Sequence, residues 1–268
     1  MSEAPAIQLD GVSISYQLAG GGRYDAVAPV DVTVADGAFV SVVGPTGCGK
    51  STLLNVAAGL AAPSTGRAAI YGEPLAGING RAGYLFQQDA LMPWKNALDN
   101  VAIGLEVQGV ARDEALARAQ TMLVRVGLKA FGDRYPHQLS GGQRKRVALA
   151  QVLVRAPKIL LMDEPFGPLD AQTRLIMGEL LSSLWQADRK AVMFVTHDLD
   201  EAIGLSDRVL IMSAGPQSRI IGDFTIPLER PRDLGEIRND PRFHKLHAEI
   251  WAVLRDEVRK TYAPEEGA

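Results

Sequence analysis

The sequence predicts an α/β fold with an antiparallel β subdomain at its start and an inserted α-helical subdomain. Three observations predict it. Apolar and polar residues alternate over 7–16 and 30–34, which indicates β-strands in the first third. A short apolar strand over 39–43 runs through a glycine-rich loop into a predicted helix, as α/β cores begin. Predicted helices and strands then alternate over 139–212, which favours right-handed crossovers and a largely parallel sheet.

Composition excludes several classes of protein. Of the 268 residues, 47% are hydrophobic and 22% charged, as in soluble globular proteins, so chain-wide disorder and fibres are excluded. The net charge is −3, so no nucleic-acid partner is expected. No apolar run approaches the ~20 residues of a membrane-spanning helix. The start lacks the features of a signal peptide, and the single cysteine cannot form an internal disulfide, which favours a cytosolic location.

The first elements are expected to follow one another closely. Asp36-Gly37 predicts a tight hairpin turn between the strand that ends at residue 34 and the strand over 39–43. The helix after the glycine-rich loop is expected from Lys50 to about Gly59, because glycine is a typical residue just past a helix end.

Helical spacing of apolar residues after residue 89 predicts the inserted subdomain. We therefore expect a core made of 1–88 and 139–232, a helical subdomain over 89–138, and a helical extension over 233–268. In the extension, Asp240-Pro241 is a good start for a helix with one apolar stripe. That stripe indicates a helix packed on its own domain, with docking of a partner as the alternative. Residues 263–268 are expected to fray.

The glycine-rich loop fits the phosphate-binding pattern G-x-x-x-x-G-K-[ST]. Its backbone N–H groups and the following helix N-terminus suit an anion. Lys50 can reach the β- and γ-phosphates, the Ser51 hydroxyl can coordinate Mg²⁺, and Thr52 can contact an inner phosphate. The alternative is a glycine-rich turn that binds nothing, but the strand-to-helix context favours phosphate. The loop consists of Gly44, Pro45, Thr46, Gly47, Cys48, Gly49, Lys50 and Ser51.

Cys48 lies inside this loop. The simpler interpretation is a small loop residue. The alternative is a thiol whose pKa is lowered beside a helix N-terminus, and which nucleotide would protect from alkylation.

Two acids follow an apolar strand over 159–162. The strand delivers Asp163 and Glu164 to its C-terminal edge, where α/β sheets place ligands. Asp163 would hold Mg²⁺, directly or through water, and Glu164 would polarise an attacking water. A strand that ends in two acids is common, so the interpretation depends on the phosphate loop.

A second helix start also suits an anion. Ser140 and Gln143 form the capping box S-x-x-Q, which by itself explains a capped helix. Gly141 and Gly142 are poor helix formers, however, and bare glycines at a helix N-terminus let a phosphate approach the backbone closely. The chain therefore carries two helix starts that suit phosphate.

The phosphate loop, the LSGGQ sequence over 139–143 and the Asp163-Glu164 strand together resemble the ATP-binding subunits of ABC transporters. The resemblance covers nearly the whole chain. It implies a P-loop NTPase core with ATP and Mg²⁺ as ligands, and ATP hydrolysis as the activity. It also implies a head-to-tail homodimer, in which each ATP lies between the phosphate loop of one subunit and the LSGGQ segment of the other.

The resemblance assigns roles to further residues. Tyr16 corresponds to an aromatic that stacks on adenine, although an aromatic in a strand is also a typical core residue. Gln87 corresponds to a glutamine near Mg²⁺ and the water, with its neighbour Gln88 as the alternative. Asp170 corresponds to the acid of a loop at the dimer interface. His197 corresponds to a histidine that contacts the γ-phosphate and steadies the catalytic carboxylate, although a histidine at a strand end can be structural.

Five segments resemble one branch of the family, the nitrate, sulfonate and taurine importers. They are 91–94, 98–101, 206–209, 230–233 and 240–251. The branch implies uptake of a small anion through separate transmembrane permease subunits, with a substrate-binding protein acting indirectly. It implies a peripheral location on the cytoplasmic face of the inner membrane.

The apolar residues Leu91, Met92 and Trp94 suggest a groove for a short helix of the pore chain, with subdomain core as the alternative. For the whole chain, the alternatives are a soluble ABC-type ATPase, a subunit for another cargo, a small-molecule kinase and a nucleotide binder without turnover.

Overall fold

The computed structural model describes residues 4–262 and divides the chain into two compact units. Residues 1–80 and 188–268 belong to the first unit, and residues 81–187 to the second. The segment 89–138 falls wholly within the second unit. The domain boundaries expected from the sequence differ from this division and stay a prediction. The fraying expected for 263–268 lies outside the described residues.

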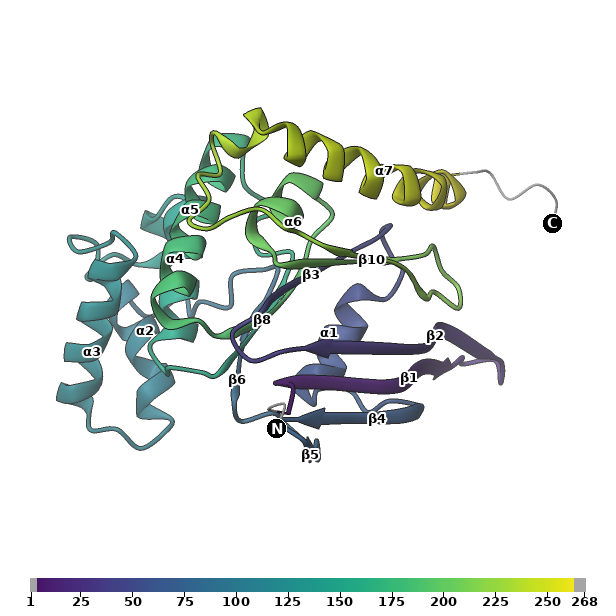
Figure 1. Cartoon of the computed structure of the whole chain (residues 1–268). Helices are drawn as coiled ribbons and strands as arrows, with labels where there is room; N and C mark the ends of the chain where they lie inside the picture. The colour runs from purple at the N-terminus through teal and green to yellow at the C-terminus, as the bar shows by residue number, and fades with distance from the viewer. Residues whose placement is uncertain (1–3, 263–268) are drawn as a thin grey trace. The chain divides into compact units, whose positions relative to one another are not determined.

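The first unit contains an antiparallel sheet with the strand order β2-β1-β4-β5. Buried valines alternate with exposed residues along the end of β2, which is the pattern of a sheet with one face in the core. The strands predicted over 7–16 and 30–34 are confirmed, and both are longer in the structure. Figure 1 shows β1 between β2 and β4. The strands are β1 (Ile7–Gln17), β2 (Arg23–Val34), β4 (Thr65–Ile70) and β5 (Glu73–Pro74).

Four further strands of the first unit lie in the order β10-β9-β3-β8. β3 pairs in parallel with β8 and with β9, and β10 pairs antiparallel with β9. All residues of β3 and β8 are buried, as in parallel sheets covered on both faces. The strands are β3 (Phe39–Val43), β8 (Ala191–Val195), β9 (Arg208–Met212) and β10 (Ile220–Thr225).

The hairpin predicted at Asp36-Gly37 is wrong. β2 pairs with β1, whereas β3 pairs with β8 and β9, so the turn connects two different sheets. The physical reason is burial. β3 is apolar on both faces and needs neighbours that are buried on both faces, which the alternating β2 cannot provide.

Among its described residues, the first unit also contains three helices and a short 3₁₀ turn. The helix α1 (Lys50–Ala58) ends at Gly59 with φ 70°, as predicted. After α6 (Leu199–Leu205), a 3₁₀ turn over Ile237–Asn239 leads into α7 (Pro241–Tyr262). Figure 1 shows α7 lying along α6, and its apolar residues join a buried cluster with α6 and β9. Packing of the extension on its own domain is therefore confirmed.

A buried arginine fixes the segment that leads to α7. Arg232 is 8% exposed and donates hydrogen bonds to carbonyl oxygens at the end of α6, including Ile203 O at 3.0 Å and Ser206 O at 2.6 Å. A cation is favourable at a helix C-terminus. Burial lowers the pKa of Arg232 to about 10, so it remains charged at neutral pH.

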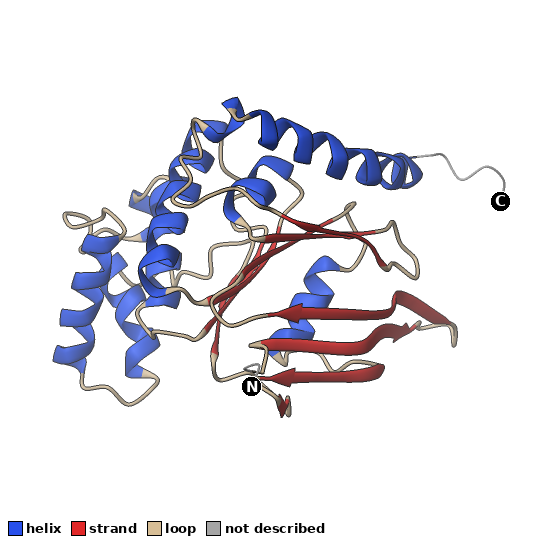
Figure 2. Ribbon diagram, in the orientation of Figure 1, coloured by secondary structure: helices blue, strands red, loops and turns tan. Residues whose placement is uncertain are grey.

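The second unit is mainly helical. Its strands β6 (Ala82–Leu85) and β7 (Ile159–Asp163) pair in parallel. Figure 2 shows α2, α3 and α4 side by side, and each of the three packs against the other two. The helices are α2 (Ala97–Glu106), α3 (Arg112–Arg125), α4 (Gly141–Leu153) and α5 (Ala171–Asp188), with a 3₁₀ turn over Pro136–Gln138. Among residues 4–262, no helix combines the length and the apolar character that a bilayer requires.

Candidate functional site

The predicted phosphate loop connects β3 to α1. Lys50 is 5% exposed, and its Nζ donates to the carbonyl oxygens of Gly44 and Pro45 at 2.9 Å each. Gly49 has φ 94°, and a Cβ there would lie 2.6 Å from Cγ2 of Val27, so no other residue fits. Within the described residues, no side chain caps α1. The first-turn amides therefore belong to a helix start of the kind that binds anions.

Cys48 is 1% exposed, and the Ser218 hydroxyl donates to its carbonyl oxygen. A Cβ on Gly44 would lie 2.9 Å from the Cys48 sulfur, so the thiol packs against the loop's first glycine. This burial supports the interpretation of Cys48 as a small loop residue. It argues against an accessible reactive thiol.

Tyr16 lies near the end of β1 and is 48% exposed. Its cross-strand partner is Tyr24 of β2, which places both rings on one face of the sheet. A Cβ on Gly215 would lie 3.8 Å from the Tyr24 hydroxyl and 3.6 Å from the carbonyl oxygen of Gly47. The two tyrosines are therefore exposed aromatics beside the phosphate loop, and no motif in the sequence identifies Tyr24.

His197 lies at the corner between β8 and α6. The Thr196 hydroxyl donates to Glu201 at 2.7 Å, and Asp198 caps α6 by accepting from the backbone N–H groups of Asp200 and Glu201. These bonds fix the corner, and His197 is its exposed residue. An exposed imidazole at the C-terminal end of a parallel strand suits a ligand contact better than a core role.

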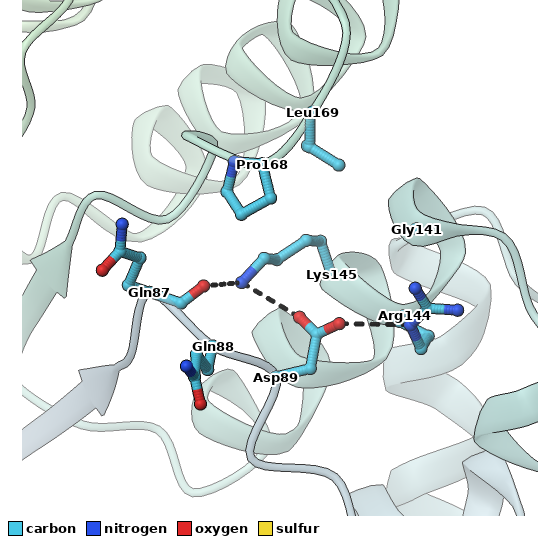
Figure 3. A pocket seen from close by; sticks show the side chains of 8 residues that line it. All are labelled: Gln87, Gln88, Asp89, Gly141, Arg144, Lys145, Pro168 and Leu169. Atoms are coloured by element: carbon cyan, nitrogen blue, oxygen red, sulfur yellow. Dashed lines mark hydrogen bonds and ion pairs between the residues drawn. The ribbon is translucent and has the colours of Figure 1, made fainter.

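In the second unit, Asp163 is the last residue of β7 and Glu164 follows it. Glu164 has φ 40°, a left-handed conformation that non-glycine residues rarely adopt and that often marks functional sites. Gln87, which follows the neighbouring strand β6, donates from Nε2 to Glu164 Oε2 at 3.4 Å. The amide of Gln88 points to a different side (Figure 3), so the geometry favours Gln87 over Gln88.

Tyr84 is a second partner of the acidic pair, and no motif in the sequence identifies it. Its hydroxyl donates a hydrogen bond to Asp163, and burial together with the Asp163 charge raises the pKa of Tyr84 well above its ordinary value. The tyrosine therefore stays protonated and orients the carboxylate. Its place in β6, beside β7, is evident only once the two strands are paired.

These residues fit a magnesium ion. Mg²⁺ is usually bound by one or two carboxylates plus substrate phosphates, rather than by a complete protein cage. Asp163 is one such carboxylate, oriented by Tyr84. In the part of the chain that the structure describes, no group of three or more His, Cys, Asp or Glu residues is arranged as a metal cage. A single oriented carboxylate of this kind is compatible with an ion that substrate phosphates also bind.

The capping box predicted at α4 is confirmed. Ser140 Oγ accepts from the backbone N–H of Gln143 at 3.2 Å, and the Gln143 side chain accepts from the Ser140 N–H at 2.9 Å. A Cβ on Gly142 would lie 2.6 Å from Cγ2 of Thr173, so packing explains this glycine. At Gly141 the nearest contact would be 3.7 Å, which is ordinary. Of these two glycines, Gly141 is therefore the one that packing does not require to be a glycine.

Asp170 caps α5. Its carboxylate accepts from the Thr173 hydroxyl at 2.6 Å and from the Thr173 backbone N–H at 3.0 Å. The hydroxyl bond is the main cause of a lowered pKa at Asp170. This residue therefore has a structural role within its own chain, and its role at a dimer interface stays a prediction.

A cavity of about 440 Å³ lies where the segment after β6, the start of α4 and the segment before α5 meet (Figure 3). The cavity is lined by Gln87, Gln88, Asp89, Gly141, Arg144, Lys145, Pro168 and Leu169. The structure therefore brings the glutamine, the capped glycines and the segment before Asp170 together within one unit. The phosphate loop, Tyr16 and His197 belong to the other unit.

A phosphate loop between a buried parallel strand and a helix, with an acidic pair at the end of another strand, defines the class of P-loop ATPases. A family model described as "ABC transporter" matches residues 27–167, which is more than half of the chain. The chain belongs to this family, as an ATP-binding subunit that hydrolyses ATP.

Individual relatives support this assignment. The taurine import ATP-binding protein TauB of Pseudomonas aeruginosa is 43% identical over 258 residues, which cover 95% of this chain and 97% of TauB. The uncharacterized ABC transporter ATP-binding protein MJ0412 of Methanocaldococcus jannaschii is 44% identical, over 90% of this chain and 88% of its own length. Among solved structures, the dimeric cassette MJ0796 in a post-hydrolysis state with ADP and Pi matches with a TM-score of 0.73. It is 31% identical and covers 83% of this chain and 100% of that chain.

Proposed function

We propose that this chain is the ATP-hydrolysing subunit of a membrane importer for a small anion of the nitrate, sulfonate or taurine type. The similarity to TauB over nearly the whole length supports it. The observation that carries the proposal is an apolar platform shortly after Gln87. It consists of the half-buried Leu91 and Met92 and of Trp94, which is 73% exposed. A motor that drives a separate pore chain needs such a contact surface.

The phosphate loop binds the nucleotide in this proposal. Its amides and Lys50 hold the phosphates, and Tyr16 stacks on the base. Ser51, Asp163 and Gln87 would hold Mg²⁺, which when bound neutralises charge on the β- and γ-phosphate oxygens.

Hydrolysis is an in-line displacement by water. Glu164 accepts a proton from the attacking water while the oxygen of that water bonds to the γ-phosphorus. The bond from the γ-phosphorus to the bridging oxygen of ADP breaks, and His197 contacts the departing phosphate. The hydrogen bond from Gln87 and the backbone conformation of Glu164 hold the carboxylate in place for this step.

A symmetric head-to-tail homodimer completes each site. The capped start of α4, Ser140 to Gln143, would approach the nucleotide bound by the partner's phosphate loop. The bare Gly141 supports this, because packing within the chain does not require a glycine there. The similar cassette MJ0796 is dimeric, which supports a dimer for this chain.

The platform has a rigid base. Asn100 is fully buried, and its side chain donates to the carbonyl oxygens of Met92, Lys95 and Asn96 while it accepts from the Met92 N–H at 2.7 Å. Trp94 is thereby held outward on an ordered turn. We assign this surface to a short helix of a transmembrane permease, which would place the chain peripherally on the cytoplasmic face of the inner membrane.

Trp94→Ala is expected to abolish most uptake in the assembled transporter while the chain keeps its ATP affinity, because the docking contact is lost and the nucleotide site is untouched. The measurement is uptake into proteoliposomes beside nucleotide binding by the same preparation. Val107→Ala is the matched control, since Val107 is 82% exposed in the same unit but outside the platform. Unchanged uptake in Trp94→Ala would exclude this docking surface.

The cargo is tested by reconstitution of the chain with its permease and binding protein. Nitrate, taurine or an alkanesulfonate is expected to stimulate ATP hydrolysis, and a sugar or an amino-acid cation is not. Stimulation only by a solute that is neither nitrate nor a sulfonate would contradict the proposed cargo and leave the transporter assignment intact. Co-purification with ribosomes or DNA, without membranes, would contradict both.

A further inference from the structure

A buried lysine of α4 contacts the segment that carries Gln87. Lys145 is 3% exposed, and its Nζ donates to the carbonyl oxygens of Gln87 at 2.6 Å and Phe86 at 3.5 Å. It also forms an ion pair with Asp89, at 2.9 Å from Oδ1 (Figure 3). The ammonium therefore faces three acceptors, all from residues 86–89.

The contact with Asp89 is extended by the neighbouring residue of the helix. Arg144 Nε donates to Asp89 Oδ2 at 3.2 Å, and another nitrogen of the same guanidinium donates to the Leu139 carbonyl oxygen at 2.8 Å. One carboxylate is thus held by two successive cations, and one of these cations also holds the residue before Ser140. The chain of contacts runs from Gln87 to the capped start of α4.

The buried ammonium of Lys145 would be unfavourable without the three acceptors that it faces. An ammonium removed from water is unfavourable unless it is paired and hydrogen-bonded. An apolar residue of similar length would fill the same space with no such penalty, but it would leave two carbonyl groups without donors and Asp89 with one cation fewer. A lysine here is therefore better suited to fixing the segment 86–89 than to filling the core.

We propose that Lys145 is a positioning residue that latches residues 86–89 to α4, so that Gln87 and the Ser140–Gly142 segment keep fixed places relative to each other. The inference rests on the proposed function, in which Gln87 serves the chain's own nucleotide and Ser140 the partner's. The latch couples the two half-sites of one chain. It also places the base of the exposed platform, which follows Asp89, on the same rigid body.

The test compares Lys145→Met with Lys145→Gln in the full-length chain. Methionine fills the space without donating, and is expected to lower kcat for ATP hydrolysis about 10- to 100-fold and to raise the Mg²⁺ concentration for half-maximal rate. The dissociation constant for ATP should stay unchanged, because binding depends on the phosphate loop. Glutamine keeps N–H donors near the carbonyl oxygens and is expected to restore most of kcat.

Arg146→Met is the matched control. Arg146 is the next residue of α4, but it donates to the Val126 carbonyl oxygen at 3.4 Å, on the other side from residues 86–89. Its kcat and Mg²⁺ dependence are expected to match wild type. If Lys145→Met does not fold, Asp89→Asn serves instead, since it weakens both ion pairs and is expected to lower kcat with ATP affinity unchanged.

Amide hydrogen exchange tests the latch independently of ATP hydrolysis. In Lys145→Met, exchange should rise over residues 86–91 and 140–143 and stay unchanged over 44–52. Wild-type exchange and wild-type kcat in Lys145→Met would overturn the latch, as would equal defects in the methionine and glutamine variants. Wild-type protein that never hydrolyses ATP would instead contradict the proposed function, and the exchange result would still decide the latch.

Discussion

Replacing Glu164 with glutamine is expected to reduce ATP turnover by a factor of about 10²–10⁴, the usual contribution of a positioned general base. The change removes the proton acceptor and keeps the shape of the side chain. Nucleotide binding should be unaffected, because the phosphate loop and Lys50 are intact. Bound ATP would persist, so the variant is also expected to accumulate as an ATP-bound dimer. Phosphate release, nucleotide affinity and molar mass in solution measure the three effects.

Glu179→Gln provides the control for this change. Glu179 is an exposed carboxylate on α5 in the same unit as Glu164. Its replacement removes the same charge as Glu164→Gln does, but at a position outside the acidic pair. Its turnover should match wild type. Hydrolysis at the wild-type rate by Glu164→Gln would show that another group accepts the proton, and His197 would be the next candidate.

Two variants that are each inactive are expected to recover activity when they are mixed. Lys50→Ala removes the cation of the phosphate loop, and Ser140→Trp blocks the capped start of α4. In a head-to-tail dimer of one copy of each, one site combines both defects and the other combines the intact Lys50 with the intact Ser140. Random pairing at equal concentrations gives mixed dimers with one intact site, so about a quarter of all sites are restored.

The recovery should depend on the concentration of both variants and vanish on dilution, since it requires association. Steady-state hydrolysis across mixing ratios measures it, with Ser140→Trp expected to bind ATP as tightly as wild type. Two outcomes contradict the shared site: activity in the Ser140→Trp variant alone, or no recovery in a mixture that forms dimers.

Local patterns were sufficient for much of the fold and the site. The helix end at Gly59, the strand over 191–195 and the capping box at Ser140 follow from short-range rules about backbone conformation and hydrogen bonding. The phosphate loop was equally predictable, because its glycines are required by the loop itself. Gly49 illustrates this with its φ of 94°.

Pairing of distant segments was beyond the sequence. The apolar pattern of β3 indicates a buried strand but does not specify its neighbours. The predicted hairpin with β2 is therefore wrong, because β3 is buried on both faces and pairs with β8 instead. The same holds for Tyr84, whose role depends on β6 lying beside β7. For Gly142, the structure adds a packing reason that the sequence pattern does not reveal, a close approach to Thr173, and the ligand contact stays a prediction.

The sequence by itself therefore determined the class of protein, the phosphate loop, the acidic pair and the capped helix start, because each is encoded within a few neighbouring residues. Only the tertiary structure decided how these parts are held. Lys145 and Gln87 are 58 positions apart, and nothing in either local pattern specifies that they meet. A buried charge is stabilised by whichever acceptors the fold brings to it, and that choice is made by packing over the whole unit.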